Sequence, residues 1–199
     1  MAKGLLFVLM EPQPLNEEEF NDWYDLEHLP EREAVPGFEV LQRYVCTGGF
    51  PRYMALYDLE STDVLHCPEY EAIGYENSSI WTKRVTRSVR GHYRMTGPQL
   101  WPGDRITERV EGHARRLTAI ICRGMDEASL VERVSWQDAP EGQVRLYRNE
   151  ANPGDHLFLV EHAAATGGTA SGLVTALEEM SPGGVVTVNQ YVPYWRRGL

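Results

Sequence analysis

The sequence lacks several features that would place it in a common class of protein. Its 199 residues include only three cysteines, which are widely spaced, so we expect neither a disulfide framework nor a C-x-x-C metal site. The longest apolar run spans residues 5–10, whereas a membrane-spanning helix needs about 20 such residues. No G-x-G-x-x-G or P-loop motif occurs, which disfavours nucleotide cofactors.

Positive charge is also scarce. Lys and Arg number 19 against 29 Asp and Glu, which gives a net charge of −10. Nucleic acids and anionic membranes both require concentrated positive charge, so neither is expected as the main partner. The first residues show no pattern of a secretory signal. Together with the unpaired cysteines, this absence predicts a cytoplasmic protein with reduced thiols.

One order of predicted strands and helices occurs twice along the chain. In the first half, strands and helices alternate as strand, helix, strand, strand, helix, strand, at 4–10, 17–29, 38–46, 52–60, 63–76 and 88–96. The same order recurs at 117–122, 126–136, 143–149, 155–162, 171–180 and 184–192. This β-α-β-β-α-β order is that of a ferredoxin-like unit. We therefore predict an α+β chain with two such domains, 1–100 and a degenerate copy at 101–199, joined by a linker within 97–114.

The helix predicted over 17–29 carries an unusual pair of residues. One face of that helix holds five side chains: Phe20, Trp23, Tyr24, Glu27 and His28. A buried carboxylate is costly unless it is paired or protonated, and its raised pKa suits a general acid or base. A neighbouring histidine titrates near neutrality. The matching segment, 126–136, has no such pair, so the fold does not require it.

We therefore predict Glu27 and His28 as catalytic residues. The alternative is structural: Glu27 pairs with Arg32 or Arg43, and His28 hydrogen-bonds at the end of the helix. No metal site is predicted, because adjacent residues diverge by about 100° around a helix. The pair also lacks the i, i+4 spacing of two zinc-binding histidines.

Four aromatic residues are the predicted substrate-binding set. Trp23 and Tyr24 flank Glu27 on the helix, and Tyr44 and Tyr57 lie on the second and third strands. A buried tyrosine hydroxyl needs a polar partner, which a ligand can supply. By strand alternation, Arg43 points to the opposite face from Tyr44, which predicts that Arg43 lies outside the pocket.

Several motifs of the first half resemble one superfamily. They are W-Y-D-x-E-H-x-P at 23–30, V-P-G-F at 35–38, R-Y at 43–44 and Y-x-A-L-Y-x-L at 53–59. This set resembles the dimeric α/β-barrel superfamily, and more narrowly the EthD-like proteins. The resemblance covers about residues 3–95, and only the strand order continues beyond them.

The resemblance implies two ferredoxin-like units whose sheets pair into a barrel with helices outside, here as an intramolecular dimer. It also implies a pocket between sheet and helices, with His28 in acid–base work. Members include cofactor-free monooxygenases, muconolactone isomerases and haem-degrading enzymes, so the fold does not fix the reaction.

The favoured interpretation is an enzyme without a cofactor. It would perform isomerisation, cyclisation, dehydration or lactone chemistry on an oxygenated aromatic or polyketide-like molecule. The alternatives are a haem or aromatic-ligand carrier without catalysis, a cofactor-free monooxygenase, or a scaffold protein. Haem could bind through His28 or His92. The partner is a small molecule in each of the first three cases, and a homodimer of the whole chain remains open.

Overall fold

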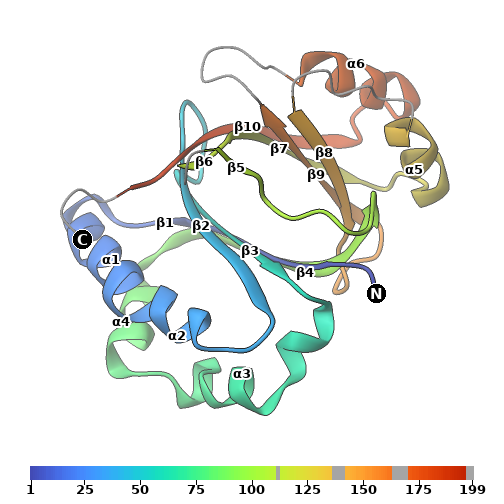
Figure 1. Ribbon diagram of the computed structural model, residues 1–199. Helices are drawn as coiled ribbons and strands as arrows, with labels where there is room; N and C mark the ends of the chain where they lie inside the picture. Colours follow the sequence, from blue (N-terminus) through green and yellow to red (C-terminus); the bar gives the residue numbers. More distant parts are fainter. Residues whose placement is uncertain (111–112, 136–141, 163–169, 196–199) are drawn as a thin grey trace.

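The protein is described by a computed structural model, which covers residues 1–110, 113–135, 142–162 and 170–195 (Figure 1). Eight antiparallel strands close into a barrel in the order β1-β3-β2-β10-β7-β9-β8-β4. Their bounds are β1 Gly4–Glu11, β2 Phe38–Cys46, β3 Tyr53–Leu59, β4 Arg90–Trp101, β7 Arg116–Arg123, β8 Gly142–Arg148, β9 Asp155–His162 and β10 Val185–Pro193. A separate pair of antiparallel strands, β5 (Arg109–Val110) and β6 (His113–Ala114), lies outside the barrel sheet. The prediction of an α+β barrel is thus confirmed.

Each half of the chain contributes four neighbouring strands. The order is β4-β1-β3-β2 in the first half and β10-β7-β9-β8 in the second, so the two halves have the same arrangement. Within a half the pairing is long, with seven residue pairs between β1 and β3 and eight between β7 and β9. The halves join through three pairs between β2 and β10 and two pairs between β4 and β8.

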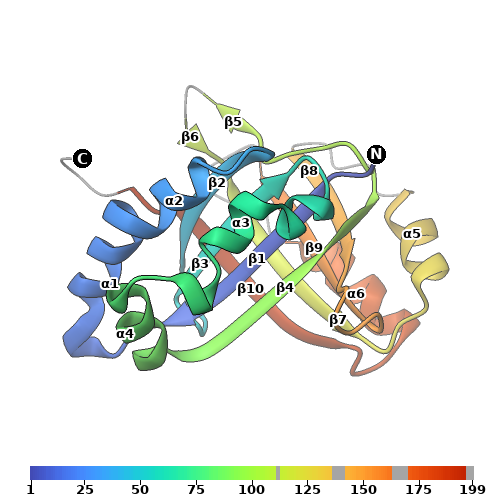
Figure 2. The ribbon, with the colours of Figure 1, turned by 90° about the horizontal axis from the view of Figure 1, so that it is seen from below.

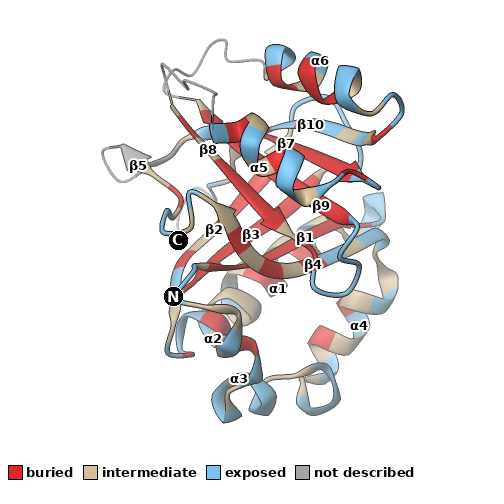
Figure 3. Ribbon diagram, turned by 90° about the vertical axis from the view of Figure 1, so that its right-hand side faces the viewer, coloured by how far each residue is buried: buried red, intermediate tan, exposed pale blue. Residues whose placement is uncertain are grey.

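Helices cover the outside of the barrel on two sides (Figures 2 and 3). On the first half lie α1 (Glu17–Trp23), a π-helical turn (Tyr24–His28), α2 (Leu29–Glu33), α3 (Pro68–Ala72) and α4 (Ile80–Ser88). On the second half lie α5 (Glu127–Ser135) and α6 (Ser171–Met180). Short 3-10 turns occupy 14–16, 62–66 and 75–77.

Successive side chains of a strand point to opposite faces of the sheet, which gives the barrel an inner and an outer apolar layer. In β1, Leu5, Phe7 and Leu9 point into the barrel and pack with residues from both halves. Leu6, Val8 and Met10 point outward, toward the helices of the first half. Both sets are almost fully buried, because β1 is covered on its two faces.

The first helix differs from its prediction at Pro30. The helical segment continues to Glu33 instead of ending near residue 29. At the π-helical turn the N–H of Leu29 donates to the carbonyl of Tyr24, five residues back. A residue without an N–H is tolerated in the first turn of a helix, and Pro30 lies in the first turn of α2, directly after the wider turn, so it does not break the helix.

The second helical region also differs. Instead of one helix over 63–76, the chain forms three short pieces, Thr62–His66, Pro68–Ala72 and Tyr75–Asn77, and then α4, which was not predicted. The predicted linker, 97–114, overlaps β4, which runs to Trp101. The division into domains at residue 100 stays a prediction, because both halves contribute to one barrel.

A charged cluster lies inside the barrel. The fully buried Arg145 of β8 donates from Nη1 to Asp58 at 2.6 Å and from Nη2 to Glu161 at 2.6 Å. Residues after β4 close over the same cluster, with the N–H of Thr107 donating to Asp58 at 2.7 Å and that of Glu108 to Glu161 at 2.9 Å. Asp58 belongs to the first half, so the cluster ties the two halves together.

Candidate functional site

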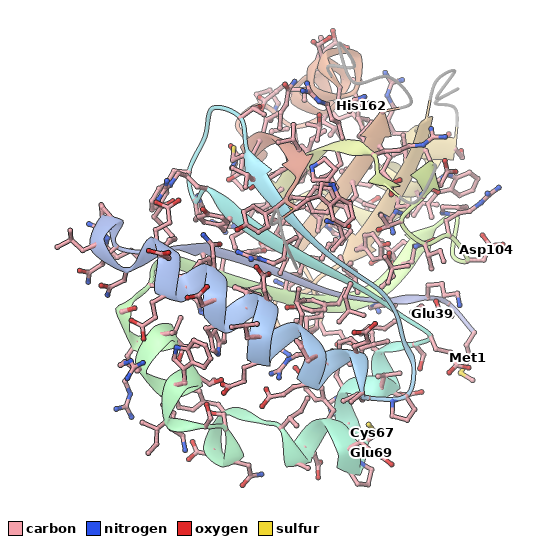
Figure 4. The ribbon with its side chains drawn as sticks, turned by 60° about the vertical axis from the view of Figure 1, so that its left-hand side comes forward. Met1, Glu39, Cys67, Glu69, Asp104 and His162 are labelled. Carbon is pink, nitrogen blue, oxygen red and sulfur yellow. The ribbon has the colours of Figure 1, made fainter. Side chains whose placement is uncertain are left out.

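A cavity of about 540 Å³ lies between the outer face of the first half of the barrel and its helices. Figure 4 shows this helical layer in front of the sheet. The apolar floor is made by outward side chains of β1 and by Tyr57 of β3. The remaining lining residues come from the helical layer and β4: His28, Arg32, Tyr70, Ile73, Gly74, Tyr75, Ser78, Thr82, Thr86, Arg87, His92 and Arg94. We call this space the helix-side cavity.

His28 closes the π-helical turn and lines this cavity. Its ring packs against Trp23, at 4.3 Å between centroids, and edge-on to Tyr24 at 5.1 Å. Nδ1 is enclosed and has no hydrogen-bond partner within the described part of the chain. Burial, and then the charges of Arg32 and Arg43, hold the pKa of His28 well below its usual range. The imidazole is therefore neutral at physiological pH.

Glu27 faces α4 and does not line the cavity. Its Oε1 accepts hydrogen bonds from Ser79 Oγ at 2.6 Å and Thr82 Oγ1 at 2.9 Å. Ser79 is also the N-cap of α4, where it accepts from the N–H of Thr82. Trp23 Nε1 donates to the same Thr82 hydroxyl at 2.8 Å. This geometry makes Glu27 an anchor between the π-helical turn and the positive end of α4.

Of the four predicted aromatic residues, only Tyr57 lines the cavity. Trp23 and Tyr24 are buried behind His28, and their rings pack against it. Tyr44 lies in the barrel interior, on the other side of the sheet. The sheet therefore separates Tyr44 from His28, and the two cannot contact one ligand in this cavity. Burial raises the pKa of Tyr24 to about 12 and that of Tyr57 well above its usual value, so both phenols stay protonated.

Arg43 lies on the helix-facing side of β2, opposite Tyr44 as alternation predicts. The cavity, however, is on the side of Arg43. Its guanidinium lies between the rings of Tyr24 and Tyr194, at 4.4 and 4.3 Å from their centroids, and donates to Asp25 at 2.8 Å. Arg43 nevertheless does not line the cavity, because these partners hold its guanidinium away from it.

The cationic part of the lining was missed by the sequence analysis. Arg32 of α2 is buried, whereas Arg87 of α4 and Arg94 of β4 are exposed. None of the residues that line the cavity is Asp or Glu, among the residues that the structure describes. These arginines lie on three separate elements, so no local spacing in the sequence brings them together.

The lining is chemically suited to haem. A neutral imidazole is the form that binds haem iron, and the guanidinium groups of Arg32 and Arg94 can pair with carboxylates. The floor is apolar, and the volume is in the range of ordinary ligand pockets. His28 Nδ1 has no acceptor of the kind that orients a ligating histidine, so iron binding through this ring would be weakened.

Comparison with solved structures shows the fold. An anthrone oxidase-like protein aligns over 98% of this chain and 92% of its own, with a TM-score of 0.61 and 10% identity. A heme-binding protein from Thermus thermophilus aligns over 98% and 92%, with 0.57 and 13%. Chlorite dismutase from Candidatus Nitrospira defluvii aligns over 96% and 91%, with 0.56 and 10%. The chain therefore has the dimeric α/β-barrel fold. No protein-family model and no curated protein sequence matches it.

The prediction that no cofactor is involved must be corrected. A protein with the same fold is a heme-binding protein, so a cofactor-free site cannot be assumed from this architecture. The EthD-like assignment stays a prediction. Within the residues described, no helix has the length and apolar character to cross a membrane. Nor do three His, Cys, Asp or Glu side chains gather there into a group able to hold a metal ion.

Proposed function

We propose that the protein binds a planar apolar molecule in the helix-side cavity, and that haem is the ligand that this lining suits best. The observation that carries the proposal is His28. It is a neutral imidazole on the cavity wall, with no hydrogen bond to the described part of the chain. Because Nδ1 is enclosed, the ring nitrogen that a ligand in the cavity can reach is Nε2.

In this proposal the chain supplies an apolar floor and a ring nitrogen. The floor of Leu6, Val8 and Met10 excludes water from one face of the ligand. His28 presents its accessible ring nitrogen to the ligand, and bound haem would supply redox chemistry at its iron. The Tyr57 ring, which is fully buried and neutral, completes the floor on the side of β3.

The second candidate is oxidation of a phenolic aromatic molecule by a cofactor-free monooxygenase. The neutral imidazole of His28 on the cavity wall favours it, because a neutral ring nitrogen can accept a proton from a phenol. The isomerisation, cyclisation, dehydration and lactone reactions stay predictions. We also interpret the matching strand orders as tandem ferredoxin-like units that form the barrel within one chain.

A haemin titration followed by absorbance tests the proposal. The wild-type protein should bind haemin with a shifted Soret band, and His28→Ala should lose the shift while keeping its circular dichroism spectrum. An unshifted band with wild-type protein would reject haem. Consumption of oxygen with a polycyclic phenol, lost in His28→Ala, would then support the second candidate.

A further inference from the structure

We propose that the helix-side cavity takes its ligand as an anion, and that a ligand carboxylate is held by Arg32 and Arg94 beside Tyr70, with Arg87 at the opening. This inference deepens the proposed function and rests on it in one respect, namely that a ligand enters this cavity. It adds the chemical class of the ligand and the residues that select it.

Tyr70 of α3 brings two of the cations together. Its hydroxyl accepts a long hydrogen bond from Arg94 Nη2 at 3.5 Å, and its ring lies 5.9 Å from the guanidinium carbon of Arg32. The same ring stacks on Phe38, with 25° between the planes. Tyr70 is thus fixed by packing, and it places guanidinium groups from α2 and β4 on one side of the cavity.

Arg87 is held in a similar way on α4. Its Nε donates to the hydroxyl of Tyr75 at 3.2 Å. Both Arg87 and Tyr75 line the cavity and are exposed, so they lie at its opening. Arg87 and Arg94 therefore each use one N–H on a tyrosine hydroxyl, and their other N–H groups stay available for a ligand.

The balance of charge points to an anionic ligand. Other arginines of the chain pair with carboxylates, as Arg52 does with Glu11 at 2.6 Å. Within the described residues, neither Arg87 nor Arg94 has a carboxylate partner, and Arg32 has only the partly exposed Glu31, at 3.0 Å. Acidic residues outnumber basic ones in the chain, with a net charge of −10, yet no Asp or Glu is among the described residues that line this cavity. A cationic cavity in an acidic protein favours an anionic guest and draws it in.

The test compares two probes of equal size in isothermal titration calorimetry. They are 2-naphthoate, which carries a carboxylate, and 2-naphthalenemethanol, which is neutral. We expect 2-naphthoate to bind at least tenfold more tightly. Arg94→Gln should weaken 2-naphthoate by roughly threefold to tenfold, since a charge-assisted contact at a partly exposed site is lost, and should leave the alcohol unchanged.

Arg84→Gln is the matched control. Arg84 lies on α4, is exposed, pairs with Glu19 and does not line the cavity, so its loss should not change either affinity. Arg87→Gln is a second variant at an exposed position of the lining, and it should also weaken binding of 2-naphthoate and keep the wild-type circular dichroism spectrum. Added salt should weaken binding of 2-naphthoate more than binding of the alcohol.

The outcomes separate this inference from the proposed function. Equal affinities for the two probes, no binding of 2-naphthoate, or equal effects of Arg94→Gln and Arg84→Gln would overturn the anion site, even if haemin binds. Arg94-dependent binding of 2-naphthoate without any binding of haemin would support the anion site and reject haem.

Discussion

Glu27 and His28 are adjacent in the sequence, yet they have different neighbours. The His28 ring reaches the cavity, whereas the Glu27 carboxylate is directed to Ser79 and Thr82 at the start of α4. Sequence reasoning identified the pair because a carboxylate on an apolar helix face needs an explanation. It could not identify the partners, which lie more than fifty positions later in the chain.

Glu27→Gln should lower the free energy of unfolding by about 1–3 kcal/mol, because two hydrogen bonds to a carboxylate are replaced by weaker ones to a neutral amide oxygen. It should leave the affinity for 2-naphthoate unchanged. Urea denaturation and calorimetry measure the two quantities, with the exposed Glu33→Gln as control. Unchanged stability combined with lost function would instead support the acid–base role predicted from the sequence.

The low pKa of His28 makes part of the stability dependent on pH. An unfolded histidine titrates near pH 6.5, whereas folded His28 stays neutral to lower pH. Below about pH 6.5 the unfolded chain binds a proton that the folded chain does not, so stability falls as the pH falls. His28→Gln should reduce this slope in urea denaturation between about pH 7 and about pH 5. Equal slopes in both proteins would contradict the burial of the imidazole.

At the scale of elements, the strands were predicted better than the helices. The strand expected over 38–46 matches β2, where side chains alternate, and that over 155–162 matches β9, which carries a continuous apolar run at 157–160. The helices of the first half depend on tertiary contacts. The turn at Tyr24–His28 shifts its hydrogen bonds by one residue, and α4, which is rich in β-branched residues, is anchored by Glu27. No local sequence pattern predicts either the π-helical turn or α4.

The contact between the π-helical turn and α4 should show energetic coupling. Ser79→Ala removes an N-cap and should cost about 1 kcal/mol. In a double-mutant cycle with Glu27→Gln, we expect a coupling energy of roughly 0.5–3 kcal/mol from urea denaturation. Pairing Ser79→Ala with the exposed Glu33→Gln should give additive effects. Additivity in the Glu27 cycle would show that the two elements are held by other contacts.

At the scale of the whole molecule, the buried cluster around Arg145 joins the halves of the barrel. Arg145→Met should lower the free energy of unfolding by about 3–5 kcal/mol, because two buried carboxylates lose their counter-charge. The deficit should shrink as the pH falls. Burial raises the pKa of Glu161, and the folded variant then takes up protons more readily than the unfolded chain.

Urea denaturation at several pH values measures this effect. Adding Asp58→Asn and Glu161→Gln to Arg145→Met removes the uncompensated charges and should recover part of the stability at neutral pH. A deficit in Arg145→Met that is independent of pH would indicate lost packing rather than unpaired charge. Unfolding in one cooperative transition is expected, since β3, β8 and β9 share the cluster.

The joins between the halves contain only three and two residue pairs, far fewer than the pairings within each half. Two separate chains meeting through such short joins would need a sufficient protein concentration to stay together. A covalent connection replaces that requirement with a high effective concentration, on the order of millimolar for a short flexible tether. The barrel therefore stays closed on dilution. Because its two sides are not copies of one gene product, one side can carry the cationic cavity while the other is free to differ.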